Sequence, residues 1–89
     1  MNAPYEGLPC SPNPFNDEAV INVRLAHAGQ VRLSVYDIRG RRMADLAEGR
    51  LMAGEHQIVW MAQALPTGVY LLRLETGPKN VVKKVVLVR

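Results

Sequence analysis

Several features that the sequence lacks exclude classes of protein. It holds one cysteine, Cys10, in 89 residues, which excludes an internal disulfide framework and a cysteine-based metal site. No apolar run is long enough to cross a bilayer. The first residues lack the basic and apolar regions of a signal peptide. A C-terminal piece of a longer secreted protein would lack one as well, so this absence does not place the chain in the cytoplasm.

Aromatic side chains and excess charge are also scarce. Aromatic residues make up 6% of the chain and its net charge is only +3. Large aromatics more often fill a core than form an exposed sugar-binding platform. Basic residues cluster only at 39–42, where a solvated hairpin tip is favoured over an anion site, and at Lys83 and Lys84. Without interleaved aromatics or a motif, nucleic-acid binding is not predicted.

The length predicts a single small domain. Residues 1–7 are interpreted as an N-terminal lead-in or cloning remnant, and residues 8–89 as the domain. Residues 4–17 contain four prolines. Because proline cannot complete a β-ladder, this stretch, the proline-rich lead-in, is expected to be extended and to add at most one irregular edge strand.

Alternating apolar and polar residues predict short strands over most of the remaining chain. The expected strands cover 19–25, 31–38, 42–47, 56–61, 69–75 and 81–89. Strand 69–75 is apolar on both faces near its start, which favours a central position in a sheet. Segment 42–47 departs from strict alternation, so a bulge or a crossing between sheets is open, and helix is the rival over 41–52. With the lead-in, about seven strands joined by turns predict an all-β sandwich.

Turn residues separate these strands. Expected turns lie at 38–41, where Gly40 can take a positive φ, at 53–55 and at 77–80. The strand phases predict that six side chains are buried together: Leu33, Val35, Trp60, Tyr70, Leu72 and Leu74. A buried Tyr70 hydroxyl should find a backbone partner.

No group of residues predicts catalysis, a metal or a cofactor. His27 and His56 lack a third ligand at suitable spacing, and His56 shares a strand face with Trp60, which favours a packed histidine. Neither Ser11 nor Ser34 lies in a nucleophile motif. The side chains of Asn16, Asp17, Glu18 and Asp37 could supply calcium ligands, but hydrogen bonding within turns is favoured. The chain is therefore expected not to be an enzyme.

Five motifs follow one another in an order and spacing typical of a known family. They are PNPFN (12–16), GQVRLSVYDIRGR (29–41), AGEHQIVW (53–60), LPTGVY (65–70) and KKVVLVR (83–89). The chain resembles the type A C-terminal sorting domains of the type IX secretion system, which are related to the immunoglobulin-like domain of flagellar hook-capping proteins. The resemblance implies an immunoglobulin-like β-sandwich of about seven antiparallel strands. Cys10 and the missing Asp-Gly after Trp60 depart from the family pattern.

The resemblance also implies a function. Such domains lie at the C-terminus of secreted proteins of Gram-negative bacteria, direct export across the outer membrane, and lead to attachment at the cell surface or release. Implied partners are the export machinery, a sortase-like peptidase and an N-terminal cargo such as a hydrolase, protease or adhesin. The motif positions carried over are Pro12, Asn13, Pro14, Gly40, Gly54, Trp60, Gly68, Tyr70 and Lys84.

The last strand is the expected recognition element, read by the export machinery through an edge with free backbone groups. Its residues are Lys83, Lys84, Val85, Val86, Leu87, Val88 and Arg89. Because Lys83 and Lys84 are adjacent, they point to opposite faces, so one must face the interior or its rim. Two other functions stay open: an accessory carbohydrate-binding module of a secreted glycoside hydrolase, and an assembly domain of a flagellar hook cap.

Overall fold

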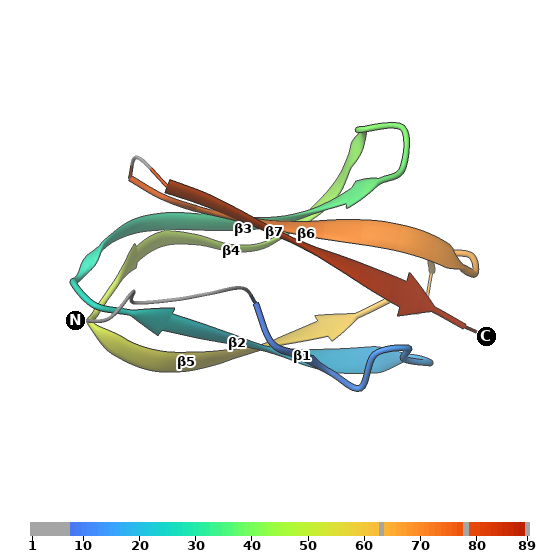
Figure 1. Ribbon diagram of the computed structural model, residues 1–89, viewed down its shortest axis with the longest axis horizontal. Coiled ribbons are helices and arrows are strands. Elements are labelled where there is room, and N and C mark those ends of the chain that lie inside the picture. Colours follow the sequence, from blue (N-terminus) through green and yellow to red (C-terminus); the bar gives the residue numbers. More distant parts are fainter. Residues whose placement is uncertain (1–7, 63, 78, 89) are drawn as a thin grey trace.

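Two antiparallel β-sheets pack face to face in the computed structural model, which describes residues 8–62, 64–77 and 79–88 (Figure 1). Residues 1–7 lie outside the described residues, so the proline-rich lead-in is described only from Leu8 onward. The strands are β1 (Cys10–Ser11), β2 (Glu18–Leu25), β3 (Gly29–Asp37), β4 (Arg42–Leu51), β5 (Gly54–Met61), β6 (Gly68–Thr76) and β7 (Lys79–Leu87). One sheet has the order β1-β2-β5 and the other β4-β3-β6-β7. The predicted β-sandwich is confirmed, as are the edge strand in the lead-in and the central position of β6.

Strict alternation of apolar residues builds the core. Every second side chain of β2, β3 and β6 is buried, and the register pairs Leu33 with Leu74 and Val35 with Leu72. Since successive side chains of a strand point to opposite faces, this spacing fills the space between the sheets. All six side chains predicted to be buried together lie in this core.

Three aromatic rings connect the two sheets. The Trp60 ring of β5 lies 4.8 Å from the Phe15 ring and 6.0 Å from the Tyr70 ring, measured between centroids. The Tyr70 hydroxyl donates a hydrogen bond to the Pro66 carbonyl at 2.7 Å, so the predicted backbone partner is confirmed. Because all three rings are buried, they do not form an exposed sugar-binding platform.

Segment 41–52, for which helix was the rival prediction, contains the strand β4. β4 pairs with β3, with register shifts between Leu33 and Ser34 and between Val35 and Tyr36. These irregularities explain why the sequence of β4 departs from strict alternation. The chain then changes sheets between β4 and β5. The connection is Met52–Ala53 rather than the predicted turn at 53–55, since Gly54, with φ of 120°, already belongs to β5.

Asp37 closes the hairpin between β3 and β4. Its Oδ1 accepts hydrogen bonds from the backbone N–H groups of Arg39 and Arg41, both at 2.9 Å, and its Oδ2 accepts one from Arg41 Nε at 2.9 Å. Gly40 has a φ of 88°, as predicted. The hydrogen bond from the Arg41 backbone is the main cause that lowers the pKa of the Asp37 carboxyl. For Asp37, hydrogen bonding within a turn was predicted in preference to calcium binding, and these are the hydrogen bonds that it forms.

Replacing Leu72 by alanine should lower the free energy of unfolding by about 2–5 kcal/mol, because the side chain is fully buried and its removal leaves a cavity. Val82→Ala is the control, since Val82 is 56% exposed on the outer face of β7. It should cost about 1 kcal/mol or less. Chemical denaturation of both variants measures the two values, and equal costs would contradict the register described above.

Asp37→Asn should make stability less dependent on pH in the acid range. The folded-state pKa of Asp37 lies below its ordinary value of 3.8. Its contribution is therefore fully present above pH 3.8 and is lost as the pH falls through the lower folded-state pKa. The melting temperatures of the wild type and D37N should differ most near neutral pH and converge in strong acid. A difference that stays constant across this range would exclude the carboxylate as its cause.

Candidate functional site

β7, the expected recognition element, is one of the two edge strands of the four-stranded sheet (Figure 1). It pairs with β6 from Gly68↔Leu87 to Thr76↔Lys79. The strand begins two residues before the predicted start at 81, so Lys79 and Asn80 belong to it rather than to a turn. It ends at Leu87, before the predicted end. The connection begins at Gly77, which has a φ of 57°. Pro78 and Arg89 lie outside the described residues.

The two adjacent lysines point to opposite faces of β7, as predicted. Lys83 is on the inward face with Val81 and Val85 and is half-buried, whereas Lys84 is on the outer face and exposed. Burial raises the pKa of the Cys10 thiol, and the positive charge of Lys83 acts in the opposite direction. Lys83 therefore lies at the rim of the sandwich, near β1.

The lead-in covers the second half of the β7 edge. Asn13 accepts a hydrogen bond from the Val86 N–H at 3.0 Å and donates one to the Lys84 carbonyl at 3.3 Å. Phe15 donates to the Val86 carbonyl at 2.9 Å and accepts from the Val88 N–H at 2.8 Å. The expectation of a free edge is therefore wrong for this part of the strand. Asn13 supplies the hydrogen bonds of a neighbouring strand with its side chain, and Phe15 does so with its backbone.

The first half of the edge is more open. In this register, the backbone N–H and C=O groups of Val82 point away from β6, like those of Val86. No hydrogen bond joins the Val82 groups to another described residue. Only a short segment around Val82 can therefore pair with an added strand, if the described residues alone are considered.

An apolar patch lies beside Lys84 on the outer face of the sheet. The register places Leu71 next to both Lys84 and Tyr36, and Val69 next to Val86. Val69 is 37% exposed and the other three apolar side chains are half-buried. We call Tyr36, Val69, Leu71 and Val86 the outer patch. The sequence carried a signal for it, because Val69 and Leu71 make the second face of β6 apolar.

The remaining motif residues have structural roles. Gly68 begins β6, and a Cβ there would make only an ordinary 3.8 Å contact with the Tyr70 ring. Gly40 and Gly54 take positive φ. Pro12 and Pro14 flank Asn13 and are exposed. The PNPFN motif (12–16) thus contains Asn13 and Phe15, the two residues that form hydrogen bonds with the β7 edge.

The two histidines lie in a strand and in a connection. The His56 ring is half-buried, and its Nε2–H donates to the Met52 carbonyl at 2.7 Å, in agreement with the predicted packed histidine. His27 lies in the connection between β2 and β3, at the end of the sandwich where β5 begins. Among residues 8–62, 64–77 and 79–88, no three His, Cys, Asp or Glu side chains are grouped to hold a metal ion. In the same residues, no helix is long and apolar enough to span a membrane.

Comparison with known families identifies the chain. The family described as "Secretion system C-terminal sorting domain" matches residues 11–88. The chain belongs to this family. The match includes β1 from Ser11, the Asn13 and Phe15 contacts and all of β7. Membership gives the chain a role in signalling for secretion.

A solved structure supports the fold of this sorting domain. PorZ, an essential surface component of the type-IX secretion system of Porphyromonas gingivalis, is similar with a TM-score of 0.66 and 19% sequence identity. The alignment covers 93% of this chain and 12% of PorZ. At this identity the likeness extends to the fold alone. Comparison with curated proteins finds no match.

Asn13→Ala should loosen the β7 edge of the sorting domain. The variant loses both side-chain hydrogen bonds to β7, which should lower the free energy of unfolding by about 1–2 kcal/mol. Amide hydrogen exchange should accelerate at Val86 more than at Val85, whose N–H faces β6. Asn16→Ala, at an exposed position, is the control and should leave the exchange of Val86 unchanged. Equal exchange of Val86 in both variants would show that Asn13 does not hold the edge.

Proposed function

We propose that this chain is the non-catalytic C-terminal module of a larger secreted protein. It directs an N-terminal cargo, such as a hydrolase, protease or adhesin, across the outer membrane of a Gram-negative bacterium. A sortase-like peptidase then acts on the exported protein, which is attached to the cell surface. The observation that carries this proposal is the family match over residues 11–88.

The recognised element in this proposal is β7, read mainly through its outer face. Lys84 is exposed there, and its cross-strand neighbour Leu71 belongs to the outer patch. When a partner binds such a surface, the charged group orients it, and the neighbouring apolar side chains become buried in the interface. From Lys84 to Val88, the hydrogen bonds of Asn13 and Phe15 occupy outward backbone groups. Recognition in this half of the strand therefore uses side chains more than strand addition.

A display assay tests the proposal. Residues 8–89 are fused behind a reporter that is targeted to the periplasm, in a bacterium that has the type IX secretion system. The fusion should reach the cell surface, whereas the reporter alone should stay in the periplasm. The K83Q/K84Q variant should show less reporter at the surface and more in the periplasm. Its melting temperature should change little, because Lys84 is exposed and the half-buried Lys83 lies at the rim of the sandwich, and surface charges contribute little to stability.

The matched control removes two positive charges elsewhere. Arg39 in the β3–β4 turn and Arg50 in β4 are exposed, and R39Q/R50Q should be displayed as well as the unmodified fusion. If the unmodified fusion never reaches the surface, the sorting proposal is wrong for this chain. If both double variants are displayed equally, recognition does not use the lysines. Reporter that is exported only into the medium would contradict the surface attachment.

A further inference from the structure

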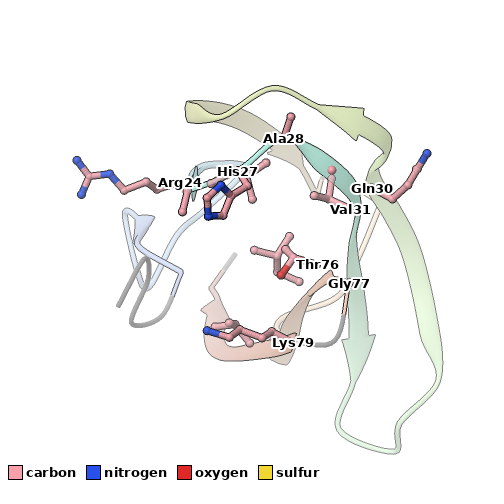
Figure 2. Close-up of a pocket in the computed structure, with 13 residues that line it drawn as sticks. Arg24, His27, Ala28, Gln30, Val31, Thr76, Gly77 and Lys79 are labelled. Atoms are coloured by element: carbon pink, nitrogen blue, oxygen red, sulfur yellow. The ribbon is translucent and has the colours of Figure 1, made fainter. Parts of the chain in front are cut away.

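A cavity of about 380 Å³ opens between the sheets at one end of the sandwich. It lies between the β2–β3 connection and the residues where β6 ends and β7 begins (Figure 2). Neither Lys84 nor the outer patch is among the described residues that line it. Its apolar lining includes Leu25, Val31, Leu74 and Val81. A volume of this size is at the lower end of the range of small-molecule sites, about 300–1,000 Å³.

The core is less completely closed at this end. Leu25 and Val31 are 8% and 5% exposed, the largest fractions among the buried core residues. β1 pairs only with Val20 and Ile21. Within the described residues, therefore, β1 does not extend along the half of β2 that leads to the cavity. Apolar side chains that remain in contact with water gain free energy when an apolar ligand covers them.

The polar groups at the opening are cationic or neutral. Figure 2 shows His27 above the opening and Lys79 below it, with Thr76 between them. The side chains of Arg24 and Gln30 point away from the cavity (Figure 2), and Arg24 forms an ion pair with Glu55 at 3.5 Å. No Asp or Glu is among the described residues that line the cavity. The opening thus combines N–H donors with a positive charge and an apolar interior.

We propose that this cavity binds a small amphiphilic anion, an aliphatic chain with a terminal carboxylate. The Lys79 ammonium and a ring N–H of His27 donate hydrogen bonds to the carboxylate, and the aliphatic chain covers Leu25, Val31 and Val81. A charge-assisted hydrogen bond orients the head group, while apolar burial supplies most of the affinity. This binding site is separate from the proposed sorting function, and neither depends on the other.

Titration of the ¹⁵N-labelled 89-residue chain with monomeric decanoate tests the site. The amide signals of residues 25–31, 74–77 and 79–81 should shift and reach saturation, while those of β4 stay in place. Decyltrimethylammonium, with the same tail and the opposite charge, should not bind. Shifts spread over the outer faces of both sheets, or no saturable shifts, would overturn the proposal. So would binding to anionic phospholipid vesicles without saturable binding of decanoate.

A pair of lysine variants separates a specific contact from overall charge. K79Q should weaken decanoate binding about tenfold, the effect of losing one charge-assisted hydrogen bond. K84Q removes the same charge from the outer face of the same strand and should bind decanoate as the wild type does. H27A should also weaken binding, because it removes the ring N–H donor. Equal losses in K79Q and K84Q, or no loss in K79Q and H27A, would exclude the proposed site.

Discussion

The contact between Trp60 and its two aromatic neighbours determines how the parts of the molecule fit together. Trp60 belongs to the three-stranded sheet, Tyr70 to the four-stranded sheet and Phe15 to the lead-in. Large rings bury much apolar area and prefer tilted or edge-to-face contacts. Packing them together fixes the spacing of the sheets and holds the lead-in against the end of β7. Phe15 also pairs with the β7 backbone, so aromatic packing and edge coverage depend on the same residue.

The β7 edge of the four-stranded sheet is partly protected from pairing with other chains, while its outer side chains remain accessible. An uncovered edge strand can pair with other chains, and proteins commonly prevent this with lysines or a covering segment. β7 has both devices: Lys79, Lys83 and Lys84 lie along it, and Asn13 and Phe15 cover its second half. The outer face of the strand remains open. A partner can therefore contact the side chains of β7 while the second half of its backbone edge stays closed to self-association.

Local signals in the sequence predicted much of the fold. The apolar alternation in β2, β3 and β6 gave the buried faces directly, and Asp37 with Gly40 predicted a hairpin whose hydrogen bonds are local. The bounds of β4 and β7 were less accurate, because bulges and the sheet crossing depend on pairing partners rather than on the strand's own residues.

The parts of the candidate site that the sequence did not predict involve distant residues. Asn13 meets Val86 across 73 positions in the chain, and no local pattern signals that an asparagine in a proline-rich stretch will cover a strand edge. The cavity is formed by two connections that are also far apart in sequence. The opposite directions of Lys83 and Lys84 were predictable from strand geometry alone. Their proposed role in recognition rests on the family resemblance and does not follow from their spacing.

The closure of the lead-in against β7 has a consequence for the order of folding. Asn13 and Phe15, between β1 and β2, contact the last strand, and Val85 and Leu87 complete the buried core. Contacts of such large sequence separation form slowly, because the entropy of a long loop is lost before the contacts form. A chain in which β7 has not yet paired with β6 has an incomplete core. The domain therefore completes its core only when the whole of β7 is in place, from one end of the sequence to the other.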